Sequence, residues 1–163
     1  MAITKSQKKE IFADVEKAVK DSKSVVFVNF HGVSVSDSTL MRKKLRGEGI
    51  GYMVAKKTIA KKVFTETGIK GDMPELAGEL ALAYSTDLIA PAREVFDFQK
   101  KLDKRISILG GIFDGKFMNK LEMMEIALIP GVKTLQAQFV QLISSPVSGF
   151  VRALDAIAKN KTI

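Results

Sequence analysis

The sequence contains no cysteine and only one histidine, His31, among its 163 residues. Without cysteine the chain cannot form disulfides, thiolate metal sites or iron–sulfur clusters, and it has no cysteine nucleophile. A single histidine also excludes a metal site built from several histidines. Charged residues follow Met1 almost at once, with no apolar stretch, so we expect no signal peptide and a cytoplasmic protein. We expect no cofactor, no metal and no membrane.

Motifs of enzymes are also missing. The chain has no GxxxxGK[ST] run, and Gly47–Gly51 lacks the GxGxxG spacing and follows a predicted helix. No combination of serine, histidine and acidic residues stands out as a catalytic triad. Since 46% of the residues are hydrophobic, the chain can still form an ordinary globular core. We predict a folded protein that is not an enzyme and takes no small-molecule substrate.

Positive charge is concentrated in the first part of the chain. Residues 1–70 hold 15 Lys and Arg against 7 Asp and Glu, whereas residues 71–163 hold 11 of each. The first segment therefore carries the entire net charge of +8. Such asymmetry favours a polyanionic partner, because Lys and Arg release counterions when they neutralise phosphates. Lysines that only keep the protein soluble are the alternative.

Apolar spacing divides the first 130 residues into alternating elements. A capping box at Thr4–Gln7 and apolar positions on one helix face predict a helix over 5–21. Short β-branched and aromatic runs predict strands over 24–30, 50–55, 80–84 and 106–113. Further helices are expected over 37–48, 58–67, 90–103 and 119–128. Ser36 is the expected N-cap of the first of these, which should point Leu40 and Leu45 inward.

This alternation predicts an α+β fold. Four short strands with helices on one face favour a split βαβ (ferredoxin-like) four-stranded sheet, followed by a long C-terminal α-helix. Gly110 and Gly111 fall inside the last predicted strand, where a bulge or a close backbone approach is the usual reason for glycine. We expect two domains, a basic α/β domain over 1–130 and a C-terminal amphipathic helix over 131–163.

The C-terminal segment has no charged residue from Thr134 to Val151, but its glutamines and serines make it too polar for a membrane span. Its apolar residues recur every three or four positions and form one stripe along a helix over about 134–159. Pro146 lies within this pattern and is expected to kink the helix or remove one hydrogen bond. The stripe predicts either a docking surface or a helix that folds back onto the sheet.

A weak internal repeat favours docking. Phe139–Ile143 aligns with Phe150–Leu154 at an offset of eleven residues, about three helical turns. Two copies of one pattern on one helix indicate two equivalent sites for the same partner.

A phosphate site is predicted where a helix begins at Lys56-Lys57-Thr58. Free backbone N–H groups, the positive end of the helix dipole, two ammonium groups and a hydroxyl all favour phosphate there. Helix 37–48 carries four more cations, and we expect the two helices to bring their basic sides together; these cations are Arg42, Lys43, Lys44 and Arg46.

Aromatic side chains that could stack on unpaired bases are scarce. Phe27, Phe30 and Tyr52 lie in strand patterns and are expected in the core. We therefore expect recognition of the backbone and shape of folded RNA more than of single strands.

Three segments resemble the bacterial large-subunit ribosomal protein L ten family, the stalk-base proteins. They are FVNFHGVSVS at 27–36, LMRKKLRGEG at 40–49 and MVAKKTIAKK at 53–62. Their order and spacing are specific together, and the likeness extends over the whole chain, including the terminal helix. The chain departs from the family pattern at His31, where arginine is frequent, and at Lys57, where asparagine is usual.

The resemblance implies a structural constituent of the cytoplasmic ribosome. Its N-terminal domain would bind large-subunit rRNA at the stalk base, beside ribosomal protein L eleven. Its terminal helix would carry dimers of the acidic stalk protein L seven/L twelve, two by the repeat, which recruit translation GTPases. Members of the family can also repress translation of their own mRNA.

Two sets of residues follow as predicted sites. The predicted rRNA-binding residues are Lys5, Lys8, Lys9, His31, Arg42, Lys43, Arg46, Lys56, Lys57, Thr58, Lys61 and Lys62. The predicted stalk-protein-binding residues are Leu135, Phe139, Leu142, Ile143, Val147, Phe150, Val151, Leu154 and Ile157. The competing hypothesis is a free-standing nucleic-acid-binding regulator that homodimerises through its last helix.

Overall fold

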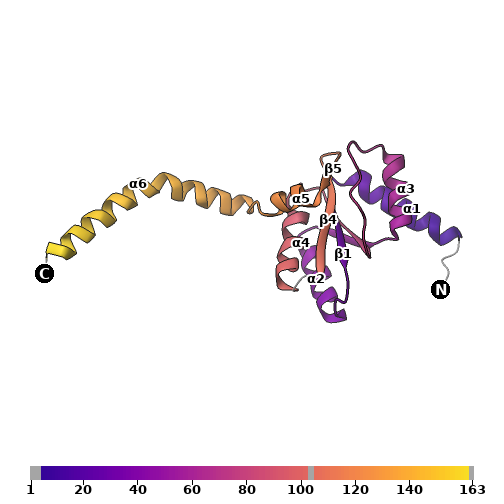
Figure 1. Cartoon of the computed structure of the whole chain (residues 1–163), viewed down its shortest axis with the longest axis horizontal. Helices are drawn as coiled ribbons and strands as arrows, with labels where there is room; N and C mark the ends of the chain where they lie inside the picture. The colour runs from indigo at the N-terminus through magenta and orange to yellow at the C-terminus, as the bar shows by residue number, and fades with distance from the viewer. Residues whose placement is uncertain (1–4, 103–104, 162–163) are drawn as a thin grey trace. The chain divides into compact units, whose positions relative to one another are not determined.

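The computed structural model describes the backbone of residues 5–102 and 105–161 and the side chains of 8–102 and 105–159 (Figure 1). The chain divides into two compact units, Met1–Ile129 and Pro130–Ile163, which we describe separately.

The first unit is built on one antiparallel sheet. Its strands are β1 (Ser24–Phe30), β2 (Gly51–Val54), β3 (Leu80–Ser85), β4 (Ile106–Phe113) and β5 (Lys116–Asn119). They lie in the order β2-β3-β1-β4-β5, so β3 is inserted between β1 and β2, and β1 between β3 and β4. This insertion is the split βαβ arrangement, and the predicted α+β class is confirmed.

The fifth strand was not predicted and corrects the four-stranded sheet. Asp114 and Gly115 have φ of 47° and 74°, so the chain reverses in two residues and β5 pairs with β4. Two residues with positive φ make the tight hairpin turn that an Asp-Gly pair favours. No element was predicted for residues 114–118, because the four-residue strand is too short to show a clear alternation.

Helices cover both faces of the sheet, which corrects the expectation of one covered face. One face is packed by α1 (Lys5–Asp21) and α3 (Lys57–Thr67). The other is packed by α2 (Val35–Gly47), α4 (Ala90–Lys101) and α5 (Lys120–Ala127). Because both faces are covered, five consecutive residues at the start of β1 are buried, with no alternation between inside and outside.

Helix α2 differs from its prediction in its N-cap and in its buried side. Ser34, rather than the predicted Ser36, is the N-cap of α2, and its hydroxyl accepts a hydrogen bond of 3.1 Å from the Asp37 N–H. The buried side of α2 consists of Met41 and Leu45, four residues apart, whereas Leu40, which was predicted to point inward, is 64% exposed.

The two adjacent glycines of β4 lie at a β-bulge and at a close approach of two backbones, the two explanations that their position in the strand predicted. The register between β1 and β4 shifts beside Phe27 and Val28, which marks a bulge. Gly110 has φ of 151°, and a Cβ on Gly111 would lie 2.5 Å from the carbonyl oxygen of Val25. Glycine therefore allows β1 and β4 to approach closely at the bulge.

The second unit is the helix α6, which runs from Val132 to Lys161 and includes Pro146. It continues through this proline, and Figure 1 shows it curving along its length. Every described side chain of α6, from 132 to 159, is exposed. No single helix in the described part of the chain is long and apolar enough to cross a membrane; only α5 and α6 taken together meet that test, by length and composition alone.

Candidate nucleic-acid interface

Strands β1 and β2 finish at the same end of the sheet, because both are antiparallel to β3, which separates them. We call this end, where Phe30 and Val54 are the last strand residues, the basic end. Helices α2 and α3 begin there, since each follows one of these strands directly. The positive ends of two helix dipoles therefore point toward the same region.

Lys56, Lys57 and Thr58 lie together at the basic end, as the sequence predicted for a phosphate site. Lys56 is the N-cap of α3 and makes no side-chain capping hydrogen bond, and all three side chains are exposed. Within the described residues neither lysine takes part in an ion pair. The first turn of α3 therefore presents free N–H groups and two uncompensated ammonium groups to solvent.

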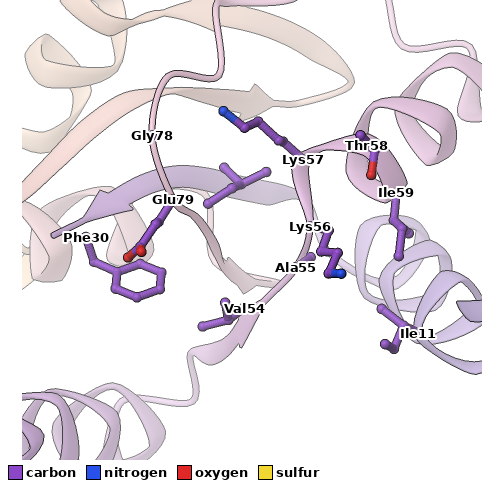
Figure 2. A pocket seen from close by; sticks show the side chains of 11 residues that line it. Ile11, Phe30, Val54, Ala55, Lys56, Lys57, Thr58, Ile59, Gly78 and Glu79 are labelled. Atoms are coloured by element: carbon purple, nitrogen blue, oxygen red, sulfur yellow. The ribbon is translucent and has the colours of Figure 1, made fainter. Parts of the chain in front are cut away.

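These residues line one side of a cavity of about 580 Å³. Figure 2 shows Phe30 and Glu79 on the opposite side, with Val54 between Phe30 and Lys56, and Ile11 and Ile59 beyond Lys56. The cavity is thus formed by α1, the ends of β1 and β2, the first turn of α3 and the segment before β3. The sequence did not predict this cavity. Phe30, which was expected in the core, packs against the core in part and also lines the cavity.

The cations of α2 form a separate group. Arg42, Lys43 and Arg46 line a shallow hollow of about 500 Å³ on the exposed side of this helix. Because α2 and α3 pack on opposite faces of the sheet, the structure does not bring their basic sides together. The expected single patch is corrected to two groups, one on each of two helices that pack on opposite faces of the sheet.

Lys44 is not part of either group. Its Nζ lies 2.6 Å from the Glu94 carboxylate, which is only 6% exposed, and Arg93 contacts the other oxygen of that carboxylate at 3.5 Å. The hydrogen bond to Glu94 raises the pKa of Lys44. This lysine therefore neutralises a buried carboxylate of the first unit.

The remaining predicted residues are distributed around the basic end. His31 directly follows β1, and its N–H donates a 2.9 Å hydrogen bond to the carbonyl of Arg105. Arg105 is exposed and adds a cation there that the sequence did not suggest, because it lies in the half of the chain without net charge. The predicted residues Lys8, Lys9, Lys61 and Lys62 are all exposed on α1 and α3, and the side chain of Lys5 lies outside the described residues.

Tyr52 on β2 contributes a neutral, partly buried ring next to the α2 group. Burial raises the pKa of Tyr52 to about 12, and the Arg42 guanidinium, 5.6 Å from the ring centre, opposes this shift. The phenol is therefore uncharged at neutral pH, and its ring holds the Arg42 guanidinium by a cation–π contact.

The predicted docking stripe on α6 is solvent-exposed in full. Its nine residues range from 42% exposed at Leu135 to 72% at Leu142. Phe139 and Phe150, which occupy equivalent positions in the repeat, are both 65% exposed. Exposed apolar patches of such extent are typical of protein interaction surfaces.

No group of three or more metal-ligating side chains occurs within the described part of the chain. A basic α+β unit and a separate, exposed apolar helix define a protein of the binding class, with one surface that suits a polyanion and another that suits a protein.

Comparison with known proteins specifies the family. The family model described as Ribosomal protein L10 matches residues 3–100. The large ribosomal subunit protein uL10 of Laribacter hongkongensis is 32% identical over 99% of this chain and 95% of its own length. Its counterparts in Burkholderia multivorans and Burkholderia cenocepacia are 34% identical over 99% of this chain and 97% of theirs.

The chain belongs to the ribosomal protein L10 family. It is accordingly a structural constituent of the large ribosomal subunit in the cytoplasmic ribosome and not an enzyme. The resemblance seen in the sequence is confirmed. Family membership gives no support to the competing free-standing regulator.

Proposed function

We propose that the basic end binds large-subunit rRNA at the stalk base, beside ribosomal protein L eleven, and that α6 anchors two dimers of the acidic stalk protein L seven/L twelve. The protein would then connect the ribosomal body to the proteins that recruit translation GTPases. The basic domain over 1–130 and the helix over 131–163 would carry these two tasks separately.

The first turn of α3 is the observation that carries the RNA-binding part. Lys56 and Lys57 are exposed and free of ion pairs, beside N–H groups that no side chain caps. Phosphate contacts of this kind fix the register of a protein on RNA without reading its sequence. The exposed predicted cations of α1, α2 and α3 would extend the contact along the RNA backbone.

The salt dependence of binding to large-subunit rRNA tests this part. Replacing Lys56, Lys57, Lys61 and Lys62 by alanine should lower the slope of log K against log salt by about 0.7–0.9 for each phosphate that is no longer neutralised. A matched control removes four lysines that lie around a hollow at the opposite end of the sheet, namely Lys20, Lys23, Lys70 and Lys116. The control has the same net charge, so an equal slope in both variants would contradict a local contact at α3.

Full exposure of the α6 stripe carries the stalk-anchoring part. Phe139 and Phe150 occupy equivalent repeat positions eleven residues apart, and neither is covered. A helix with an uncovered apolar face fits a partner that supplies a groove or a second helix. Two equivalent positions support two copies of that partner.

Native mass spectrometry on the nuclease-treated complex from cells tests the anchoring. We expect four copies of one small acidic protein on the wild type, and two copies after either Phe139→Asp or Phe150→Asp. Gln141→Asp adds the same charge on the polar side of the helix and should leave all four. A stable homodimer of the protein alone would contradict the proposal and restore the regulator hypothesis.

The family resemblance also implies repression of the protein's own mRNA. We propose that the same basic end would bind the mRNA leader, because one phosphate-binding surface can accept either RNA. Addition of rRNA should then relieve repression in a purified translation reaction, and the four-lysine variant of α3 should not repress.

A further inference from the structure

The cavity at the basic end is lined by both apolar and positively charged side chains. Phe30 and Val54 give it apolar walls on one side and Ile11 and Ile59 on the other, and Lys56 lies between these two pairs (Figure 2). Lys57 also lines the cavity. Phe30 is partly buried, whereas Val54 is 49% exposed at the end of an edge strand. A volume of about 580 Å³ lies within the range of small-ligand sites in proteins.

The occupant must combine an apolar face with negative charge. A nucleotide has both, since its base presents a flat π-face and its phosphate follows within one backbone linkage. Glu79 adds an acceptor beside Phe30, and no ion pair engages its carboxylate among the described side chains (Figure 2). A carboxylate in that place can accept a hydrogen bond from the exocyclic amino group of a base.

We propose that this cavity receives one unstacked base of the bound RNA, with the flanking phosphates on Lys56 and Lys57. The base stacks on Phe30 and packs against Val54. This inference rests on the proposed RNA binding and refines it: the protein reads the RNA backbone and shape over most of its surface, and it takes up a single looped-out nucleotide at this point.

Filling the cavity tests the proposal without changing any charge. Val54→Trp places a large ring in the cavity from an exposed position, and Leu121→Trp is the matched control, since Leu121 on α5 is 76% exposed and does not line the cavity. The probe is a transcript of the large-subunit rRNA stalk-base region, bound by the full-length protein. We expect Val54→Trp to weaken binding roughly 5- to 150-fold at constant salt, which is the effect of removing one base stack.

The salt slope and the chemical footprint separate the cavity from the phosphate contacts. Val54→Trp should keep the wild-type salt slope and should lose protection from dimethyl sulfate at one unpaired nucleotide, whereas Leu121→Trp should keep both. Equal affinity and an unchanged footprint for the two variants would overturn the base-binding cavity while leaving RNA binding in place. Absence of any rRNA binding by the wild type would overturn the proposed function as well.

A fluorescence measurement keeps the test decisive if Val54→Trp does not fold. The sequence contains no tryptophan, so Phe30→Trp introduces a single indole at the predicted stacking position. Stacking on a base quenches indole emission, and we expect quenching that saturates together with binding of the same transcript. Binding without quenching would overturn the proposal.

Discussion

Adjacent lysines of α2 have different roles because their surroundings differ. Lys43 is exposed and lines the hollow on the outer side of the helix, whereas Lys44 pairs with the buried carboxylate of Glu94 at 2.6 Å. Removing one partner of a buried charge leaves the other without compensation. The sequence placed both lysines in one basic cluster, because it does not show which carboxylate α4 brings toward α2.

Lys44→Met should therefore reduce the free energy of unfolding by about 1–3 kcal/mol, since Arg93 continues to contact Glu94. Lys43→Met should change it by less than about 0.5 kcal/mol. Urea unfolding followed by circular dichroism measures both. Equal effects of the two substitutions would show that the ion pair with Glu94 contributes nothing to stability.

Tyr52 makes stability sensitive to alkaline pH. Burial raises its pKa from 10.0 to about 12, so the unfolded chain releases the phenol proton at lower pH than the folded protein. The stabilising contribution is complete below pH 10 and is lost as the pH rises toward 12. We expect the melting temperature of the wild type to fall more steeply over this interval than that of Tyr52→Phe. Parallel curves for the two proteins would contradict the burial of the phenol.

At the scale of elements, the glycine pair of β4 determines how closely two strands approach. A Cβ on Gly111 would lie 2.5 Å from the Val25 carbonyl oxygen and 2.2 Å from the Met123 side chain. Because the backbone of β1 cannot move without disturbing its pairing with β3, Gly111→Ala should cost about 1–3 kcal/mol of stability.

Gly47→Ala provides the control, because nothing lies within 4 Å of a Cβ at that position in α2. It should leave stability unchanged or increase it slightly, since alanine favours a helix. Thermal unfolding of the two variants gives the comparison. An equal melting temperature for Gly111→Ala and the wild type would mean that β1 and β4 can separate at the bulge.

Element types were predictable where local signals act alone. The β-branched run of β1 and the 3.6-residue period of α6 both predicted their elements from adjacent residues. The hairpin to β5 was missed although Asp114-Gly115 is a favourable turn pair, because the strand after it has only four residues. The distribution of α2 and α3 on opposite faces depends on tertiary packing, and periodicity cannot show which face a helix covers.

In the candidate site, too, the features set by neighbouring residues were predictable and those set by tertiary packing were not. Exposure of the lysines on α3 follows from their spacing and was foreseen. The cavity was not, because it forms only where Phe30, Val54 and Glu79 meet from three segments distant in the sequence. A terminal strand residue such as Phe30 has the same pattern whether it lies in the core or at the wall of an open cavity.

At the scale of the molecule, the hydrophobic core of the first unit is complete without the second. No described residue beyond Ala127 belongs to the buried core, and the side chains of α6 are exposed from 132 to 159. The described apolar side chains of α6 form an exposed surface outside that core. Their conformational order must therefore be supported by helix propensity and by a partner.

A chain that ends at Ile129 should consequently unfold with the same free energy as the first unit of the full-length protein, within about 0.5 kcal/mol. It should keep its affinity and salt slope for the stalk-base rRNA transcript and should retain no stalk protein in native mass spectrometry. Calorimetry on both chains measures the stability, and the full-length protein is the control. A marked loss of stability on truncation would mean that the apolar stripe of α6 packs on the first unit in solution, and the stripe would then be part of the core instead of an anchor for other proteins.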